Sequence, residues 1–456
     1  MKQNINIAAE IEGYKKRNTT APNTKKLDWE YDPTGHDIFK KTHIYKDKWI
    51  ESEYEDEKGE MQKSKTLVPL NRIGLPYQKY ITKVAVTFLF GNPVKYANND
   101  STQEKEKSLY DAFKKVISKN KMQFVDREIA STVSRFTECA ELWYDYEGKE
   151  DYAFPSDRIL KVKILKPDVE KLFPIFDDKD NLTSFGREFK SGDNTYFVVY
   201  TAEKEITYKE EKGSWTKTET KNLLGKIPVV YYRQEEVEWE DVQSSILRLE
   251  KIYMNAAESN DKFAFPILGL HGEVTGQFSK DDSGKVIQLK GDNSRAEFVV
   301  PPQANEGLKD EIGRLDDMIH LFTNTPNVFS LKNIEGLGNM LGGENAKFIF
   351  LSAHLKVMEK SAIYIPALMR RVSILKAYLK TLNPKFEKEE LDVEPIITPY
   401  IVDNEQEFNR FAMEMTGGKQ LWSTQYAMEK MGISDAKKMQ EEIDTEKELS
   451  AAEDII

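Results

Sequence analysis

Cysteine is nearly absent from this sequence of 456 residues, in which Cys139 is the single example. One cysteine excludes a disulfide within the chain and is typical of a reducing compartment. Long apolar runs are absent too, because the longest, Val84 to Phe90, is far shorter than the ~18 residues that a membrane span needs. Residues 1–16 also lack the apolar core of a signal peptide, so we expect neither a membrane protein nor an exported one.

Clustered metal ligands are missing as well. Asp177, Asp178 and Asp180 begin like a calcium loop, but Leu182 stands at a ligand position and no glutamate closes the loop. We therefore interpret this stretch as the tip of a β-hairpin. The five histidines are scattered along the chain, with no pair at the spacing of a helical metal site: His36, His43, His271, His320 and His354.

The Gly-rich stretch from residue 328 to 345 does not fit a nucleotide-binding loop. Gly338 and Gly343 have the spacing of a P-loop, but Glu344 occupies the lysine position and would repel a phosphate. Leu341 replaces the third glycine of a dinucleotide motif after Gly336 and Gly338. No pair of carboxylates is set among apolar residues as an acid–base couple. We therefore expect no cofactor, no bound metal and no enzymatic activity.

The formal net charge of −11 argues against a protein that grips nucleic acid over a broad face. Tight binding of phosphates needs many unpaired lysines and arginines on one surface. An acidic balance is nevertheless compatible with a protein past which a nucleic acid has to slide.

The chain is organised around the stretch from Glu238 to Thr325, which predicts two helices joined by a compact tip. Apolar residues recur at steps of three and four in both helices, which gives each one an apolar stripe. Between them, Phe265 to Pro302 is rich in glycine and β-formers and has no helical period. We call the two helices the stalk; its stripes are Val242, Ile246, Leu249, Tyr253 and Ala256, then Leu308, Ile312, Leu315, Ile319 and Phe322.

Ahead of the stalk, the pattern predicts a strand over His36 to Trp49 and a charged loop over Glu51 to Lys65 that turns at Gly59. A helix follows and ends at Gly91, and two more helices come next. The second of these two is expected to reach Ala140, with Cys139 as a core thiol beside it.

From residue 142 to 232 the apolar period changes to two, which predicts an antiparallel meander packed on helices. After the stalk, a long helix over residues 346–382 contains Pro366, which should kink it. Leu391 to Val402 is expected to be extended, and short helices finish the chain. The fold class predicted from these elements is α+β.

Each stalk helix carries a net charge of −3, with six acids against three bases over residues 238–263 and five against two over 305–325. Two interpretations stay open at this point. The acids form either an ordinary solvated helix face or a wall that must not adhere to a polyanion.

Four local signatures, in their order along residues 70–450, resemble portal proteins of long-tailed bacteriophages. The first is Asn71 to Tyr96, whose helix ends in Gly91-Asn-Pro-Val94. The second is Gly225 to Val230, which leads into the first stalk helix. The third, Gly343-Glu-Asn-Ala-Lys347, is similar to a family pattern of small residue, Gly, x, Ala, Leu, Lys, but with one inserted residue. The fourth is the C-terminal run with Gly417-Gly418.

The resemblance implies a portal-type fold with a helix-rich wing, a two-helix stem, a small α/β clip, a long kinked helix and a helical crown. On this sequence the parts fall at 1–237 (wing), 238–263 (stem helix 1), 264–304 (clip), 305–327 (stem helix 2), 328–345 (tunnel loop), 346–402 (wing) and 403–456 (crown).

The function that the resemblance implies is a DNA channel. The family forms a homo-oligomeric ring, usually of twelve subunits, at one vertex of the capsid, and double-stranded DNA passes through it during packaging and ejection. Implied partners are the terminase large subunit, a head–tail adaptor, and the major capsid and scaffolding proteins. The implied location is the virion, and the host cytoplasm during assembly.

Candidate site residues follow from this anatomy. Tunnel-loop residues expected near DNA are Lys332, Asn333, Asn339 and Lys347. Stem acids expected at the channel are Glu311, Asp316 and Asp317. Clip residues expected to dock partners are Phe265, Leu268, Leu270, Val286 and Leu289.

Two rival hypotheses belong to other classes. A monomeric or dimeric adaptor would use its helical hairpin to bind a partner protein as a coiled coil. A DNA-processing enzyme would need a clustered metal or nucleotide site, which the sequence does not reveal.

Overall fold

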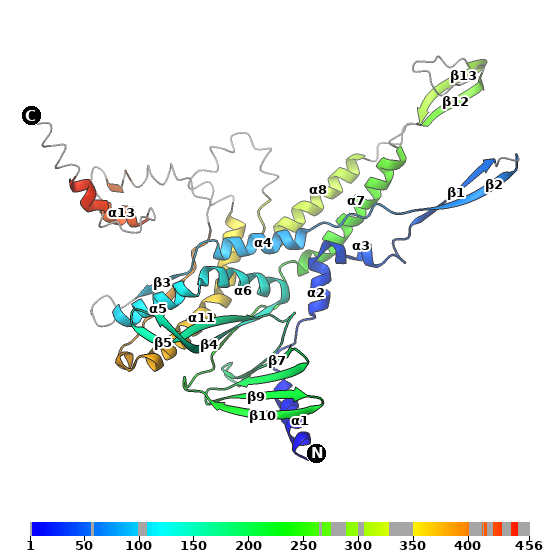
Figure 1. Cartoon of the computed structure of the whole chain (residues 1–456). Helices are drawn as coiled ribbons and strands as arrows, with labels where there is room; N and C mark the ends of the chain where they lie inside the picture. Colours follow the sequence, from blue (N-terminus) through cyan, green and yellow to red (C-terminus); the bar gives the residue numbers. More distant parts are fainter. Residues whose placement is uncertain are drawn as a thin grey trace, which may run out of the picture.

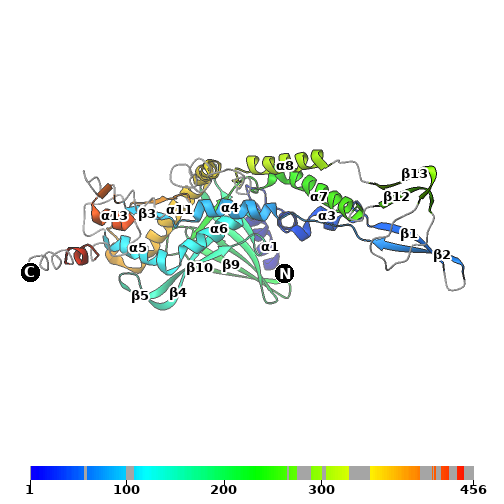
Figure 2. The ribbon, with the colours of Figure 1, turned by 90° about the horizontal axis from the view of Figure 1, so that it is seen from above.

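The computed structural model describes residues 2–55, 59–98, 107–263, 267–274, 289–299, 305–327 and 350–400, together with 413, 415–416, 423–430 and 439–445. It shows a body of helices and antiparallel sheets from which the stalk and two β-hairpins project in one direction (Figures 1 and 2). None of the helices in the described part of the chain combines the length and apolarity of a membrane span.

Four helices form the centre of the body: α4 (Tyr77–Phe90), α5 (Lys107–Lys119), α6 (Met122–Phe136) and α11 (Leu351–Leu382). Their apolar faces share the largest core cluster, in which Leu109, Phe113 and Val133 are fully buried. This confirms the three helices predicted ahead of the meander and the long helix after the stalk. Helix α11 continues on both sides of Pro366, and η4 (Pro384–Phe386) follows it.

The core also contains an ionic network around Arg371, whose side chain is fully buried in α11. Its guanidinium contacts Asp126 of α6 at 2.7 Å and Glu141 at 2.6 Å. Tyr96 and Tyr232 accept hydrogen bonds from the same group through their hydroxyl oxygens, at 3.1 and 3.2 Å. A buried guanidinium needs this degree of pairing, so the network fixes how α11 lies on α6 and the sheet.

The predicted meander is present, but its strands are divided between two sheets. One has the order β11-β4-β5, with β4 (Glu138–Asp151), β5 (Pro155–Leu165) and β11 (Val229–Arg233). The other has the order β10-β9-β8-β7-β6, with β6 (Lys171–Phe176), β7 (Leu182–Ser191), β8 (Asn194–Tyr200), β9 (Lys204–Glu211) and β10 (Ser214–Lys221). The N-terminal helix α1 (Lys2–Lys15) packs on this second sheet through Ile11.

The hairpin tip predicted at Asp177 to Asp180 is present, and a second tip joins β9 to β10. Asp177 accepts hydrogen bonds from the backbone N–H groups of Lys179 and Asn181, which is turn chemistry rather than metal binding. Lys212 and Gly213, with φ of 50° and 81°, connect β9 to β10.

The prediction that the helix before the meander reaches Ala140 is wrong. Helix α6 ends at Phe136 because Thr137 takes a left-handed backbone with φ of 66°. Cys139 and Ala140 therefore lie in β4, and Cys139 is a buried core thiol as expected. Burial raises the pKa of this thiol well above its ordinary value.

The predicted strand from His36 to Trp49 is also wrong. This segment begins with the short helix α3 (Asp37–Lys40), and only its last two residues, Lys48 and Trp49, lie in a strand. Ahead of it come α2 (Thr24–Tyr31) and η1 (Pro33–Gly35). The predicted charged loop over Glu51 to Lys65 is instead most of a hairpin, β1 (Lys48–Glu55) and β2 (Met61–Val68), in which Gly59 sits near the turn with φ of 83°. We call β1–β2 the side hairpin.

The stalk consists of α7 (Gln243–Phe263), preceded by η2 (Glu240–Val242), and α8 (Asn305–Phe322). It carries β12 (Ile267–Val274) and β13 (Leu289–Val299), which we call the outer hairpin. The extended return predicted after α11 contains β14 (Val393–Ile396), which pairs with β3 (Lys95–Asn98). In the C-terminal part, α13 (Thr424–Lys430) is one of the short helices expected there.

Candidate functional site

The predicted apolar stripes of the two stalk helices pack against each other near the body. Val242, Ile246 and Leu249 of the first segment are fully buried against Ile319 of α8. Trp239, also fully buried, closes this cluster at the body, and its indole Nε1–H donates to Glu30 at 3.1 Å. The stalk is therefore anchored where it leaves the body.

Packing becomes looser toward the outer end of the stalk. Tyr253 and Ala256 on α7 are only half-buried, as are Leu308 and Ile312 on α8. At the opposite end of α8, where the chain returns to the body, Phe322 is 55% exposed. Part of each stripe is thus uncovered within one chain.

Asp316 of α8 is held by neighbouring side chains rather than free in solvent. The hydroxyl of Tyr77 donates to it at 2.5 Å, and the amide of Asn327 donates at 3.0 Å. Burial, the hydrogen bond and the charge of Asp316 together raise the pKa of Tyr77 well above its ordinary value. This carboxylate joins α8 to α4 of the body.

Glu311 and Asp317 have different surroundings. Glu311 forms an exposed ion pair with Arg248 of α7 at 2.7 Å. Asp317 is exposed, and the described part of the chain offers it neither an ion pair nor a hydrogen bond. With about 100° between successive residues, Asp317 lies on the same face of α8 as Glu306 and Asp310, opposite the apolar stripe. These three exposed acids form what we call the acidic face of α8.

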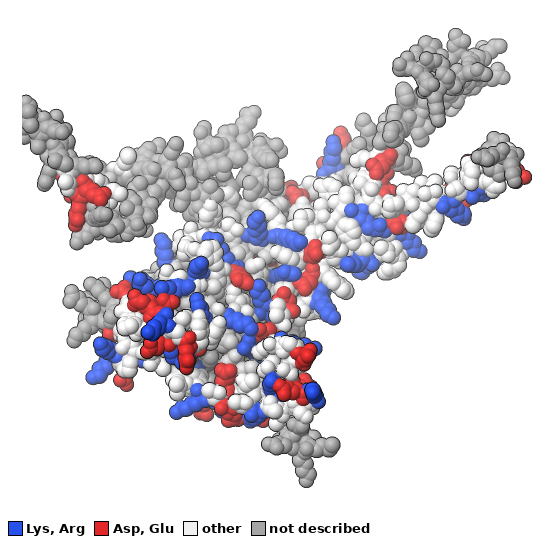
Figure 3. All heavy atoms as spheres, in the orientation of Figure 1, with Lys and Arg blue, Asp and Glu red and all other residues white. Residues whose placement is uncertain are grey.

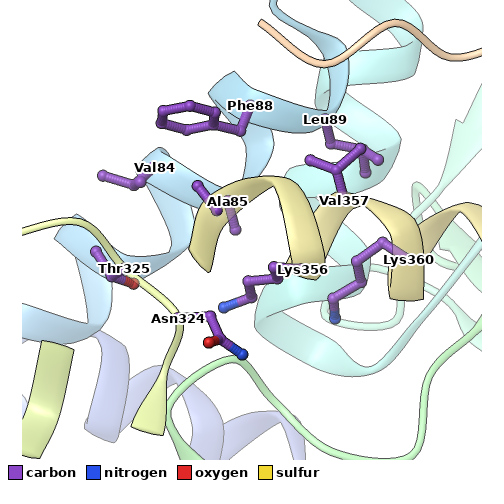
Figure 4. Close-up of a pocket in the computed structure, with 10 residues that line it drawn as sticks. Val84, Ala85, Phe88, Leu89, Asn324, Thr325, Lys356, Val357 and Lys360 are labelled. Atoms are coloured by element: carbon purple, nitrogen blue, oxygen red, sulfur yellow. The ribbon is translucent and has the colours of Figure 1, made fainter. Parts of the chain in front are cut away.

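A second ionic junction ties the stalk to α11. Glu238, just before η2, contacts Lys356 at 2.6 Å and Lys360 at 2.5 Å. Lys356 also donates to the carbonyl oxygen of Thr323 at 2.9 Å, and Lys360 donates to Gln234 at 2.7 Å. Figure 4 shows both lysines extending from the same side of α11, with Asn324 close to Lys356.

Glu238 keeps its negative charge although its side chain is buried. Burial alone would raise the pKa of Glu238, but the two lysines outweigh it and hold that pKa below its ordinary value. The junction therefore fixes the end of α8 and the start of α11, the two described segments that flank residues 328–349. The predicted tunnel-loop residues Lys332, Asn333, Asn339 and Lys347 lie outside the described residues.

The outer hairpin contains three of the five predicted clip residues. Leu268 and Leu270 lie in β12, opposite Phe298 and Ala296, and Leu289 of β13 lies opposite Val274. Phe265 and Val286 are outside the described residues. Within 267–274 and 289–299, the predicted α/β unit consists of these two strands.

A buried histidine links the N-terminal segment to the stalk. His36 contacts the carboxylate of Glu250 through Nδ1 at 2.5 Å and the carbonyl oxygen of Glu30 through Nε2 at 2.7 Å. A carboxylate and a backbone carbonyl both accept hydrogen bonds, so this pair of partners favours the protonated imidazole. Burial alone would lower the pKa of His36, but its contacts with Glu250 raise that pKa above the ordinary value.

Sequence reasoning missed the junctions and the side hairpin, although some signals were present. Lys356 and Lys360 are spaced to share one helix face. Glu51, Glu53 and Glu55 alternate at the strand period, as do Lys63 and Lys65. Nothing in the local pattern pointed to Tyr77 as the partner of Asp316, because the two residues belong to distant segments.

The arrangement suits mechanical and binding roles. Among the described residues there is no cluster of three or more His, Cys, Asp or Glu side chains that would hold a metal ion. What the geometry offers is a braced helical pair with an exposed acidic face and a pair of hairpins at its end.

The chain matches the model of the phage portal protein family of the SPP1 Gp6-like type over residues 14–452. It therefore belongs to this family, which confirms the predicted resemblance. Chains of two solved structures are similar to it over most of its length. For the neck of an empty GTA particle, the TM-score is 0.43 and the identity 11%, with 79% of this chain and 90% of the other covered. For the virion of a native gene transfer agent particle, the values are 0.41 and 9%, with 77% and 88% covered. No curated protein matches the chain.

Proposed function

We propose that this chain, as a member of the SPP1 Gp6-like phage portal family, assembles into a ring of identical subunits that forms a channel for double-stranded DNA. The observation that carries the proposal is the family match over residues 14–452. The ring has twelve subunits, the number that the resemblance implies, and sits at one vertex of the capsid in the virion. It assembles in the host cytoplasm and does its work without catalysis of its own.

In this proposal the stalk is the portal stem and the outer hairpin belongs to the clip. The body forms the wing, residues 328–345 the tunnel loop, and residues 403–456 the crown. The clip docks the terminase large subunit during packaging and a head–tail adaptor afterwards, while the wing meets the major capsid and scaffolding proteins. The residues proposed for docking at the clip are Phe265, Leu268, Leu270, Val286 and Leu289.

The acidic face of α8 supports a channel that passes DNA without holding it. Each contact between a cation and a phosphate adds affinity that must be broken at every step of translocation. Exposed, unpaired carboxylates repel the phosphates instead. Glu311 and Asp316 contribute negative charge to the same helix, although their partners Arg248 and Tyr77 give them a second, structural task.

Tunnel-loop residues Lys332, Asn333, Asn339 and Lys347 make the brief contacts with the DNA in this proposal. The glycines of this segment suit a chain that must approach the duplex closely. Deleting Gly336 to Gly343 is expected to leave ring assembly intact and to impair packaging. A ring that no longer forms would instead identify the segment as a structural joint.

The proposal is tested first by the mass of the purified full-length protein in solution and by negative-stain electron microscopy. We expect closed rings. A chain that stays monomeric or dimeric at high concentration would refute the ring and favour the alternative function, an adaptor that binds a partner protein through its helical hairpin.

A second test separates the three stem acids within assembled rings. Asp317→Lys is expected to slow DNA packaging with little effect on the stability of the subunit. Asp316→Lys is expected to destabilise the subunit first, because it removes the acceptor for Tyr77 and Asn327. Unchanged packaging kinetics with Asp317→Lys would place the acidic face of α8 away from the channel.

A further inference from the structure

Helix α11 carries an apolar stripe that one chain leaves uncovered. Its large members are at least half-exposed: Leu351 at 50%, Leu355 at 52%, Met358 at 70% and Met369 at 54%. Ala362 and Pro366, which are also exposed, fill the interval between them. Steps of three and four residues place this whole set on one face of the helix, which we call the α11 stripe. Exposed apolar side chains gathered on one face indicate that a partner covers it.

A hollow lies beside the α11 stripe, where the stalk meets the body. Its volume is about 750 Å³, and Phe322 of α8 and Ile363 of α11 contribute apolar surface to it. Glu359 also lines the hollow and follows Leu355 by one helical turn, so the hollow and the stripe adjoin. We call it the stalk-base hollow. A space of this size can admit a large side chain from another molecule.

Unpaired acids line the stalk-base hollow. Four exposed carboxylates on its walls have neither an ion pair nor a hydrogen bond in the described part of the chain: Glu235, Glu236, Asp241 and Glu359. Arg233 is the one lining base in the same condition, because Lys356 and Lys360 are already paired with Glu238. The hollow therefore suits an apolar group that brings a positive charge with it.

Helix α2 presents that combination on its surface. Lys25 and Trp29 are one helical turn apart and both exposed, Trp29 by 60%. Lys25 has no ion pair or hydrogen bond with any described residue. Asp28 of the same helix pairs with Arg135 of α6 at 2.5 Å, which holds α2 in place before a partner arrives. In Figure 3 the surface over α2 shows Lys or Arg atoms next to uncharged atoms.

The stalk-base hollow and the exposed face of α2 lie on opposite sides of α6. Asp126 of α6 contacts Arg371 of α11 at 2.7 Å, whereas Arg135, nine residues later and so about 180° around the helix, contacts α2. Helix α6 stands in front of α11 in Figure 1. On α11 itself, Arg371 lies on the face opposite the α11 stripe, so the stripe points away from α6. A ring of identical subunits needs two such different surfaces on each chain.

We propose, on the basis of the ring proposed above, that Trp29 of one copy inserts into the stalk-base hollow of the neighbouring copy. Lys25 then lies among the four acids of the hollow, and α2 covers the adjoining part of the α11 stripe. A tryptophan that fills a pocket at the centre of a contact is typical of an interface hot spot. The opposite charges set the orientation in which the two copies meet.

Charge reversal tests this contact in the full-length protein. Lys25→Glu adds an acid to a hollow that already holds four, so we expect it to weaken subunit association by roughly tenfold or more. Adding Glu359→Lys to the same chain should recover much of the association, which mass measurement over a dilution series follows. Lys190→Glu, at an exposed lysine of β7, is the matched control and should have little effect. A double variant that associates no better than Lys25→Glu would contradict the proposal.

Removal of the tryptophan gives a second measurement. Trp29→Ala is expected to weaken association by roughly tenfold or more, because the hollow loses its occupant. Tyr146→Ala, which removes an exposed aromatic side chain of β4, should change association far less. Thermal unfolding of the dissociated subunit should be the same for both variants, since both side chains are exposed in one chain. Equal association of the two variants would exclude Trp29 as the inserted group.

Cross-linking identifies the copies that meet. Lys25→Cys is combined with Glu359→Cys, and a short bismaleimide joins cysteines that come close, while the buried Cys139 stays unreactive in the folded chain. We expect a ladder of covalent dimers, trimers and larger species up to the full ring, and no ladder with either single variant.

Other cross-linking outcomes contradict the proposal in distinguishable ways. A cross-linked monomer means that α2 meets the stalk-base hollow of its own chain. Rings of wild-type size without a ladder mean that something other than α2 of a second copy fills the hollow, and they leave the portal function standing. If the wild-type protein forms no ring, both this contact and the proposed function are refuted.

Discussion

The two ends of the stalk are built differently. At the body, Ile246 and Ile319 are fully buried, and charged groups are paired inside the protein, as Glu238 is with Lys356 and Lys360. At the outer end, the apolar residues of the stalk are half-buried, and neither hairpin has a third strand among the described residues. One chain stabilises the inner end by itself, whereas we expect the outer end to depend on partners. Mutations at the two ends should therefore act on different quantities, folding of the subunit and association of subunits.

The largest effect is expected from the junction at Glu238. Glu238→Gln leaves Lys356 and Lys360 buried without their counter-charge, which should cost about 3–5 kcal/mol of unfolding free energy. Urea unfolding of the dissociated subunit measures it. Glu235→Gln, an exposed neighbour, is the control and should change the free energy by less than about 0.5 kcal/mol. Similar values for the two variants would show that the junction does not brace the inner end.

Apolar packing along the stalk gives the next comparison. Ile246→Ala removes a fully buried side chain and should destabilise the subunit by about 2–5 kcal/mol. Leu321→Ala, at a residue that is 68% exposed, should stay within about 0.5 kcal/mol. The same unfolding experiment measures both. Comparable losses would mean that Leu321, at the body end of α8, is covered within one chain despite its exposure.

The His36–Glu250 contact predicts a dependence on pH at the inner end. The folded pKa of His36 is raised, so the contact contributes fully below the unfolded value of about 6.5 and is lost as the pH rises through the folded pKa. A hydrogen bond to a charged group contributes roughly 1.5–3 kcal/mol. Thermal unfolding between pH 6 and pH 10, followed in the wild type and in His36→Gln, should show a steeper alkaline loss in the wild type. Parallel curves would mean that this imidazole is not charged in the folded protein.

The smallest effect is expected from the exposed pair of Arg248 and Glu311. Their side chains are 50% and 42% exposed, so solvent screens the attraction and the pair should contribute about 0.2–1 kcal/mol. A double-mutant cycle with Arg248→Ala and Glu311→Ala isolates that coupling. Coupling well above 1 kcal/mol would show that the middle of the stalk is braced as strongly as its inner end.

Local sequence pattern was sufficient for the helices of the body and stalk. Spacing at three and four residues located α4, α5, α7 and α8 because one apolar face must be buried in each. It failed at the end of α6, over His36 to Trp49, and at the side hairpin. Thr137 ends α6 by adopting a left-handed backbone conformation, which the presence of a threonine does not indicate. The charged residues of β1–β2 resembled a loop because that hairpin has no buried face in one chain.

The sequence by itself determined the stalk, its apolar stripes, its acidic charge and the order of segments that marks a portal. Only the tertiary structure decided which acids are free. Asp316 and Asp317 are neighbours in sequence, yet Tyr77 and Asn327 bind the first, while the second is exposed without such partners in the described chain. Likewise, His36 and Glu250 are 214 residues apart. Periodicity records which face of an element is buried, whereas the role of a charged side chain depends on what distant segments bring within hydrogen-bonding distance.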